Sequence, residues 1–144
     1  MTVVLDSSAL VKRYVDEPNQ EVVRSLNEGL VVSDVVRVEV PSALWRKHRH
    51  RELDDTQIRV LIALFEEDWS SRETGDPVFS SIAMSVDVLG SAAVHVGRHG
   101  LRALDGIQLA TALLAQHHLG GIRFACFDDR LRLAAQREGL ALIP

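Results

Sequence analysis

Short apolar runs alternate with helical patterns along this chain. The runs cover residues 2–5, 30–33, 122–127 and 140–143, and a weaker one covers 78–84. Continuous apolar runs of this length are typical of strands that are buried on both faces of a parallel sheet. Strands that alternate with helices predict an α/β fold, with right-handed parallel crossovers and helices covering both faces of the sheet.

The segments between these runs have the apolar spacing of amphipathic helices. Asn19, Asp54 or Asp55, and Ser85 are suited to cap three of the helices, and a break is expected at residues 75–77. Pro41 favours a kink or a late start in its helix, because proline removes one intrahelical hydrogen bond. The predicted helices cover residues 7–15, 20–28, 34–51, 85–98, 105–118 and 131–138, and a further long helix runs from 55 through Trp69.

Length and composition indicate one soluble domain over residues 1–144. The formal net charge is −4, so any affinity for nucleic acid has to come from local basic patches or bound metal ions. A single cysteine, Cys126, excludes an internal disulfide. No apolar run approaches the roughly 18 residues of a membrane span, and no leader is evident, so a cytoplasmic protein without membrane contact is expected.

Acidic residues follow two of the predicted strands. Asp6 comes directly after the first strand and Asp128 after the strand at 122–127. If both strands are central and parallel, both carboxylates reach the edge of the sheet where such folds bind their ligands. The alternative is that each aspartate only caps the helix that follows it.

Two further acids lie on predicted helices. Glu39 falls within the apolar arc of its helix, where a carboxylate is costly unless it is paired or bound to metal. An ion pair with an arginine, or displacement by a kink at Pro41, would also explain it. Asp105 has the capping-box spacing to Gln108, yet the same position would place it beside the sheet edge.

Several carboxylates on one rim favour a divalent metal site. Mg²⁺ takes one or two carboxylates directly and keeps several waters. Such a site can activate water and neutralise charge on a phosphoryl group. The acids therefore predict a metal-dependent nuclease.

Five motifs, in this order and at this spacing, resemble the PIN-domain ribonucleases, and most closely the VapC-type toxins of toxin–antitoxin pairs. The likeness covers essentially the whole chain. The motifs are VLDSSALVK at 4–12, VEVPSAL at 38–44, LRALDGIQLA at 101–110, FDDRL at 127–131 and GLALIP at 139–144.

The resemblance implies a three-layer α/β/α sandwich around a mainly parallel sheet of four or five strands. It implies a Mg²⁺- or Mn²⁺-dependent endoribonuclease in which Asp6, Glu39, Asp105 and Asp128 form the acidic quartet. It also implies a homodimer that is inhibited by a cognate VapB-type antitoxin, with which it forms a hetero-oligomer.

Three positions depart from the family pattern or add to it. Cys126 stands where the family usually has Thr or Ser, and Gln108 stands where His is common. Asp129 offers a second acid beside Asp128, although Asp128 keeps the family spacing to Leu131.

In the mechanism we expect, Asp6 and Asp105 are the main ligands of one Mg²⁺. Glu39 and Asp128 hold its waters or a second ion, and an activated water attacks the phosphodiester in line. The hydroxyls of Ser7 or Ser8 could orient a phosphate, although an ordinary first-turn role is expected for Ser7.

Two basic segments and two tryptophans could contact RNA. The run at 46–51 is expected to be mostly a solvated helix end, whereas Arg98, His99 and Arg102 are expected nearer the cleft. Trp45 and Trp69 could stack on bases, but their place on apolar helix faces favours packing.

Other functional classes fit less well. A haloacid-dehalogenase phosphatase needs a second Asp two residues after the first, where this chain has Ser8. A phospho-receiver domain needs an acid pair after the first strand, and Ser7 takes the second place. A catalytically inactive PIN-like module that binds RNA or protein is the remaining alternative, and metal-dependent cleavage distinguishes it from a nuclease.

Overall fold

A five-stranded sheet runs through the middle of the molecule in the computed structural model, which describes residues 1–71, 74–75 and 77–144. Its strand order is β3-β2-β1-β4-β5, and every neighbouring pair is parallel. The first strand of the chain therefore lies at the centre of the sheet. This confirms the predicted α/β class with a parallel sheet.

Helices and strands alternate as the sequence predicted. The weak strand at 78–84 is present as β3. The elements are β1 (Val3–Leu5), α1 (Ser7–Val11), α2 (Gln20–Arg24), β2 (Leu30–Ser33), α3 (Val36–Arg49), α4 (Asp55–Ser70), β3 (Ser80–Ile82), α5 (Val86–His99), α6 (Ala103–Leu119), β4 (Arg123–Ala125), α7 (Asp129–Arg137) and β5 (Ala141–Leu142).

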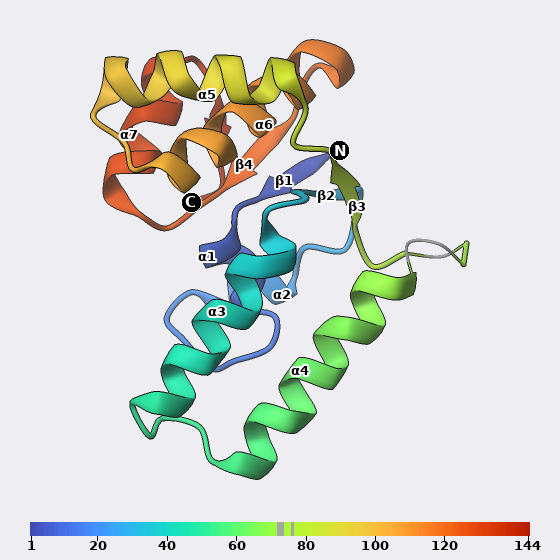
Figure 1. Ribbon diagram of the computed structural model, residues 1–144. Coiled ribbons are helices and arrows are strands. Elements are labelled where there is room, and N and C mark those ends of the chain that lie inside the picture. The colour runs from blue at the N-terminus through green and yellow to red at the C-terminus, as the bar shows by residue number, and fades with distance from the viewer. Residues whose placement is uncertain (72–73, 76) are drawn as a thin grey trace.

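Two apolar layers cover the two faces of the sheet. Along β1, Val3 and Leu5 point into a core formed mainly with α1 to α4, and Val4 points into a second core formed with α6 and α7. Figure 1 shows α5, α6 and α7 grouped on one side of the sheet. Both faces are buried, which explains why the strands are apolar without alternation.

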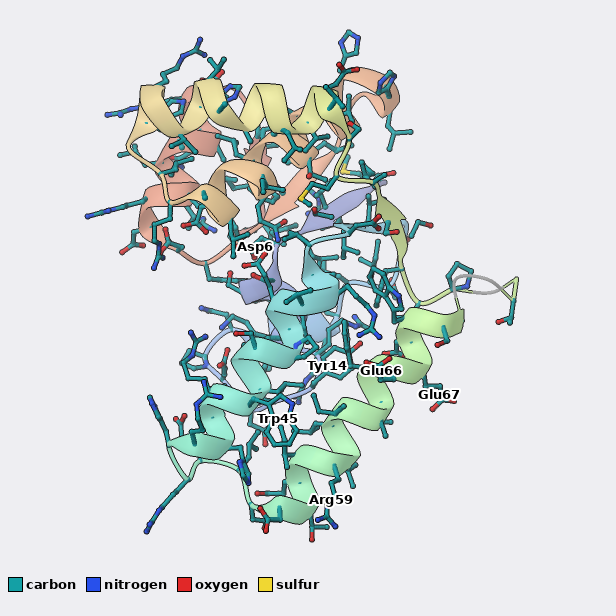
Figure 2. All side chains as sticks on the ribbon, viewed as in Figure 1. Asp6, Tyr14, Trp45, Arg59, Glu66 and Glu67 are labelled. Carbon is teal, nitrogen blue, oxygen red and sulfur yellow. The ribbon has the colours of Figure 1, made fainter. Side chains whose placement is uncertain are left out.

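A long hairpin of α3 and α4 extends away from the sheet (Figure 1). Arg37 donates to both carboxylate oxygens of Glu66, at 2.7 and 2.8 Å, and joins the two helices. Beneath them the Tyr14 hydroxyl donates to Asp68 at 2.7 Å, and its ring packs edge-on against Phe65. Figure 2 shows Tyr14 and Glu66 on this inner side of the hairpin.

Several local predictions need correction. The helix expected over 7–15 ends at Val11, because the next amides bond three residues back and the chain tightens into turns. Pro41 lies inside α3, which begins at Val36, so the late helix start, one of the two alternatives at Pro41, is not observed. Asn19 precedes α2 but has a left-handed backbone and makes no side-chain cap. The break predicted at 75–77 follows the end of α4, and residue 76 lies outside the described residues.

Cap predictions at the longer helices are confirmed. Asp54 and Gln57 form a reciprocal capping box at α4, and Ser85 accepts from the Val88 amide at α5. In the described residues, no helix is long and apolar enough to cross a bilayer.

The contact between α5 and α6 depends on Gly106. A Cβ atom built there would lie 2.5 Å from Val96 Cγ2 and 3.3 Å from the carbonyl oxygen of Ala92. The two helices thus approach more closely than any side chain at this position allows. This approach sets the position of the α6 start, which carries Asp105.

We expect Gly106→Ala to lower the free energy of unfolding by about 1 to 2 kcal/mol, because overpacking outweighs the better helix propensity of alanine. Urea unfolding measures the change. Gly97→Ala in α5 is the matched control, since its Cβ would meet open space and should be neutral or stabilising. Adding Val96→Ala to Gly106→Ala should recover part of the lost stability, because it removes the side chain that the new Cβ meets. A Gly106→Ala protein as stable as the original would contradict the close packing of α5 and α6.

Candidate active site

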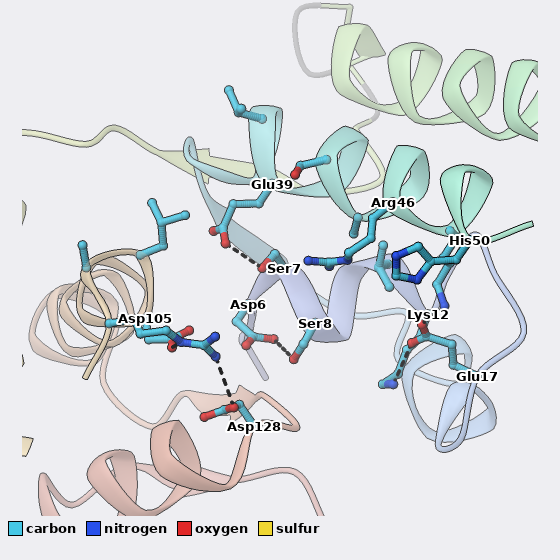
Figure 3. Close-up of a pocket in the computed structure, with 18 of the residues that line it drawn as sticks. Asp6, Ser7, Ser8, Lys12, Glu17, Glu39, Arg46, His50, Asp105 and Asp128 are labelled. Carbon is cyan, nitrogen blue, oxygen red and sulfur yellow. Dashed lines mark hydrogen bonds and ion pairs between the residues drawn. The ribbon is translucent and has the colours of Figure 1, made fainter. Parts of the chain in front are cut away.

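A cleft of about 720 Å³ opens at the carboxyl end of the central strand. Asp6 follows β1 directly, as predicted for a parallel sheet. All four acids that the sequence singled out line this cleft, from four different segments of the chain (Figure 3): Asp6, Glu39, Asp105 and Asp128. Their predicted convergence is therefore present in the structure.

Asp6 is the most buried of these acids, with 3% of its surface exposed. Its Oδ1 accepts from the Ala9 amide at 2.8 Å and from Ser8 Oγ at 2.7 Å. Burial raises the pKa of Asp6 to about 7, the two hydrogen bonds oppose that rise, and the charges of Glu39 and Asp105 add to it. Asp6 thus caps α1 with one oxygen while its carboxylate remains costly to ionise.

Ser8 links the two strand ends that carry Asp6 and Asp128. Its hydroxyl donates to Asp6 and accepts from the Phe127 amide at 3.2 Å. The expected role of Ser8 in orienting a phosphate has no support in these contacts, since the hydroxyl is occupied within the protein. Its observed role is to fix the position of Asp6.

Glu39 is held by two side chains on different helices. Gln108 Nε2 donates to its Oε1 at 2.9 Å, and Ser7 Oγ donates to its Oε2 at 3.1 Å. Partial burial raises the pKa of Glu39, although both hydrogen bonds favour its charged form. Among the described residues no arginine pairs with Glu39, so the ion-pair alternative is not observed, and the ordinary first-turn role expected for Ser7 is wrong.

The sequence did not identify Gln108 as a partner of Glu39. Gln108 is 1% exposed, and its Oε1 is buried without a hydrogen-bond partner among the described residues. The available signal was a polar residue on the inner face of a helix, four positions from the buried Ala112.

Asp105 and Asp128 lie at the starts of α6 and α7. Asp128 caps α7 by accepting from the Leu131 amide at 3.0 Å, as the capping alternative predicted. Asp105 is inside the first turn of α6, whose cap position is Arg102, so the capping box with Gln108 is wrong. Arg102 Nε lies 3.3 Å from Asp105 Oδ2, and its Nη2 lies 3.6 Å from Asp128 Oδ2.

The acids suit a hard divalent cation by their chemistry. They are all carboxylates, the oxygen ligands that Mg²⁺ and Mn²⁺ prefer. Burial makes the charge on Asp6 costly, so a bound cation would relieve that cost. Within the described residues no group of three or more His, Cys, Asp or Glu stands ready to hold one ion.

The opposite end of the cleft is basic. Arg46, in the last turn of α3, and His50, its C-cap, lie near Lys12 (Figure 3). Lys47 also lines the cleft. Arg46 and His50 are exposed and form no side-chain ion pair in the part of the chain that the structure describes. Two residues of the run at 46–51 therefore face the cleft without an acidic partner among the described residues.

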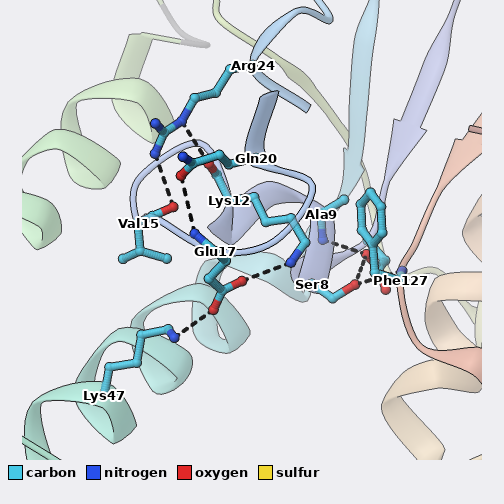
Figure 4. A network of polar contacts seen from close by, with 10 residues as sticks. Ser8, Ala9, Lys12, Val15, Glu17, Gln20, Arg24, Lys47 and Phe127 are labelled. Carbon is cyan, nitrogen blue, oxygen red and sulfur yellow. Dashed lines mark hydrogen bonds and ion pairs between the residues drawn. The ribbon is translucent and has the colours of Figure 1, made fainter. Parts of the chain in front are cut away.

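Glu17 joins the two lysines at this end (Figure 4). Its carboxylate lies 3.0 Å from Lys12 Nζ and 2.6 Å from Lys47 Nζ. Lys12 is 7% exposed, and its Nζ lies 5.0 Å from the centroid of the Phe127 ring. The network thus ties α1, which follows Asp6, to α3, which carries Glu39.

Other candidates lie away from the cleft. Arg98 and His99 both contact Glu138, at 2.9 and 2.7 Å, so their predicted place near the cleft is wrong. Asp129 is exposed and does not line the cleft. Cys126 is fully buried in the second core, and burial raises the pKa of its thiol.

Trp69 packs as predicted, whereas the packing predicted for Trp45 is not observed. Trp69 lies against the first core beside Phe65 and Phe79. Trp45 is 43% exposed on α3 and lies edge-on to His48. Neither lines the cleft.

Comparison with known proteins gives consistent matches over nearly the full chain. The profile of the PIN domain family matches residues 3–136. Ribonuclease VapC46 of Mycobacterium tuberculosis (strain ATCC 25618 / H37Rv) is 32% identical over 146 aligned residues, which cover 98% of this chain and 95% of that protein.

Solved structures share the fold. FitAcB from Neisseria gonorrhoeae superposes with a TM-score of 0.62 and 20% identity, covering 99% of this chain and 97% of that one. PAE2754 from Pyrobaculum aerophilum superposes with a TM-score of 0.61 and 15% identity, covering 99% of this chain and 83% of that one. A chain of a toxin–antitoxin complex from Klebsiella pneumoniae superposes with a TM-score of 0.58 and 16% identity, covering 88% of this chain and 87% of that one.

Proposed function

The chain belongs to the PIN domain family, and from this premise we propose that it is a metal-dependent endoribonuclease, the toxin of a type II toxin–antitoxin pair. The similarity to a VapC ribonuclease over 98% of the chain supports the activity. The fold shared with a toxin–antitoxin complex is consistent with the toxin role.

The observation that carries the proposal is the buried carboxylate of Asp6 among further acids at one end of a cleft. Its raised pKa means that the metal-free site holds unfavourable negative charge. A residue that only capped α1 could be a neutral asparagine or serine, without the cost of a buried charge. A site that binds a divalent cation would need that charge.

In this proposal Asp6 and Asp105 are the ligands of Mg²⁺ or Mn²⁺, and Glu39 and Asp128 hold its waters. When bound, the ion supplies activation of water and neutralisation of phosphoryl charge. Ser8 and the Ala9 amide fix one oxygen of Asp6, which leaves the other for the ion. Ser7 and Gln108 donate hydrogen bonds to the Glu39 carboxylate and fix its orientation.

The basic end of the cleft would position the RNA strand. Arg46 and His50 lie along the cleft from the acids and can contact phosphates next to the scissile bond. The protein has an overall negative charge, so this local patch has to provide the electrostatic attraction.

The remaining parts of the proposal concern assembly. Residues 1–144 would act as one PIN domain in the cytoplasm, as a homodimer that a VapB-type antitoxin inhibits within a hetero-oligomer. Co-expression with a candidate VapB-type antitoxin, followed by measurement of the mass of the complex, tests this part.

A further prediction concerns Gln108. We expect Gln108→Leu to reduce cleavage about 10- to 100-fold and to weaken Mn²⁺ binding, because Glu39 loses a hydrogen bond that orients it. The free energy of unfolding should change by less than about 1 kcal/mol, since the substitution also removes a buried oxygen without a partner. Gln136→Leu on exposed α7 is the control. Normal cleavage by Gln108→Leu would exclude this positioning role.

The decisive experiment is cleavage of a mixed cellular RNA pool by purified, antitoxin-free protein, with Mg²⁺, with Mn²⁺ and with EDTA. Discrete cuts that need metal and disappear in Asp6→Asn are expected. Cutting that survives EDTA or the substitution would indicate another mechanism or a contaminant. A folded protein that cuts under no condition would instead be an inactive binding module.

A further inference from the structure

Arg102 is the one cation that contacts the acidic quartet within the described part of the chain. One nitrogen approaches Asp105 and another approaches Asp128, so the guanidinium bridges two acids that start different helices. The contact to Asp128 is drawn as a dashed line in Figure 3. The bridge lies at the mouth of the cleft, where the arginine side chain is 77% exposed.

Helix stability does not explain an arginine here. Arg102 occupies the cap position of α6 and makes no side-chain cap hydrogen bond. Ser, Thr, Asp and Asn stabilise this position, and a positive charge near a helix N-terminus opposes the helix dipole. Among the described residues, the guanidinium forms its hydrogen bond and ion pairs with these two acids alone.

These contacts are also easily broken. Each carboxylate contacts the guanidinium through one oxygen, at 3.3 or 3.6 Å, and not in a bidentate pair. An exposed ion pair of this kind is weak in water. A divalent cation carries twice the charge and would take over the same oxygens. The arginine would then be left at the mouth of the cleft, without its two partners.

We propose that Arg102 exchanges between two partners: the Asp105 and Asp128 carboxylates in the metal-free protein, and a backbone phosphate of the RNA once metal is bound. This inference rests on the proposed nuclease function and adds a substrate-binding residue to it. A guanidinium matches the oxygens of a phosphate, with which it forms paired, charge-assisted hydrogen bonds.

The exchange predicts opposite effects of Arg102→Ala on metal and on RNA. Without RNA, Mn²⁺ binding followed by calorimetry should become about 2- to 5-fold tighter, because a competing cation is gone. In cleavage assays the KM for RNA should rise about 5- to 10-fold with little change in kcat, because a phosphate contact is lost. The dependence of RNA affinity on salt should become shallower.

Two variants control for charge and for shape. Arg98→Ala removes an exposed arginine that pairs with Glu138 outside the cleft, and should leave both metal affinity and KM unchanged. Arg102→Lys keeps the charge and should bind metal with an affinity near that of the original protein. Its KM for RNA should rise less than that of Arg102→Ala, because lysine cannot form the paired hydrogen bonds of a guanidinium.

Every outcome bears on the inference. Weaker or unchanged metal binding in Arg102→Ala would overturn it, and tighter metal binding with an unchanged KM would leave Arg102 as a counter-ion only and overturn the RNA contact. If the original protein cuts no RNA, the proposed function fails instead. The metal titration then still reports whether Arg102 competes for the carboxylates.

Discussion

Asp6→Asn is expected to raise the free energy of unfolding of the metal-free protein at pH 8 by about 2 to 4 kcal/mol while abolishing metal-dependent RNA cleavage. The substitution removes a charge from a buried position and keeps the shape of the side chain. The amide oxygen can still accept from Ser8 and from the Ala9 amide, so the cap on α1 is retained.

The sign follows from the pKa of Asp6 in the two states. Burial raises it from 3.8 to about 7 in the folded protein. Below pH 3.8 both states bind the proton, and the carboxylate costs no stability. Between pH 3.8 and 7 only the unfolded state ionises, so stability falls as pH rises, and above pH 7 the full cost remains. This difference in the pKa of Asp6 corresponds to about 4 kcal/mol, which is the upper limit for the increase in the free energy of unfolding in Asp6→Asn.

Urea unfolding in EDTA at pH 4 and pH 8 measures the effect. The two proteins should be nearly equal at pH 4 and differ at pH 8, and adding Mg²⁺ should stabilise only the protein with Asp6. Asp16→Asn is the control, because Asp16 lies on the surface and its side chain is 86% exposed. An Asp6→Asn protein that is less stable at pH 8 would show that the cleft already compensates the charge.

Glu17→Gln is expected to lower the free energy of unfolding by about 2 to 3 kcal/mol at pH 7. Glu17 is the shared partner of Lys12 and Lys47, and all three side chains are less than a quarter exposed. Glutamine can accept from only one lysine and turns an amide group toward the other. Two half-buried ammonium groups would then lack a negative partner.

The pH dependence identifies the charge as the cause. Partial burial raises the pKa of Glu17, but hydrogen bonds from Lys47 and Lys12 outweigh it and hold the pKa below the usual 4.5. A lowered pKa stabilises the folded state above pH 4.5, and that contribution disappears as pH falls through the folded value. The difference in stability between the original protein and the Glu17→Gln variant should therefore shrink in acid.

Thermal or urea unfolding at pH 7 and pH 3 tests this prediction. Glu21→Gln on exposed α2 controls for the loss of one negative charge and should be close to neutral. We also expect slower cleavage by Glu17→Gln, since the network connects the helices that follow Asp6 and carry Glu39. A loss of stability that is the same at both pH values would indicate packing rather than charge.

The local sequence pattern predicted where two acids of the site lie. Asp6 and Asp128 follow apolar strands, and parallel strands necessarily end at the same edge, so their meeting could be inferred without coordinates. Capping a helix and lining the site are not exclusive roles for these two residues. The structure shows that one carboxylate oxygen caps a helix while the residue still lines the cleft.

Long-range partners could not be predicted in the same way. Gln108 and Glu39 are 69 positions apart, and nothing local to either residue indicates the other. Arg98 and Arg102 are one helical turn apart in number, but α5 ends between them at Gly100, so they contact different acids. The direction of a side chain after a turn depends on backbone angles that periodicity does not give.

The position of β1 has a consequence for synthesis. It pairs with β2 and with β4, and the hydrogen bond between Ser8 and the Phe127 amide spans 119 positions. A ribosome therefore has to deliver almost the entire chain before the central strand gains its second neighbour and Asp128 reaches the cleft. Contacts of such long range also form slowly. Truncated nascent fragments would lack the complete site, so a cell would meet this activity only in the finished, folded protein.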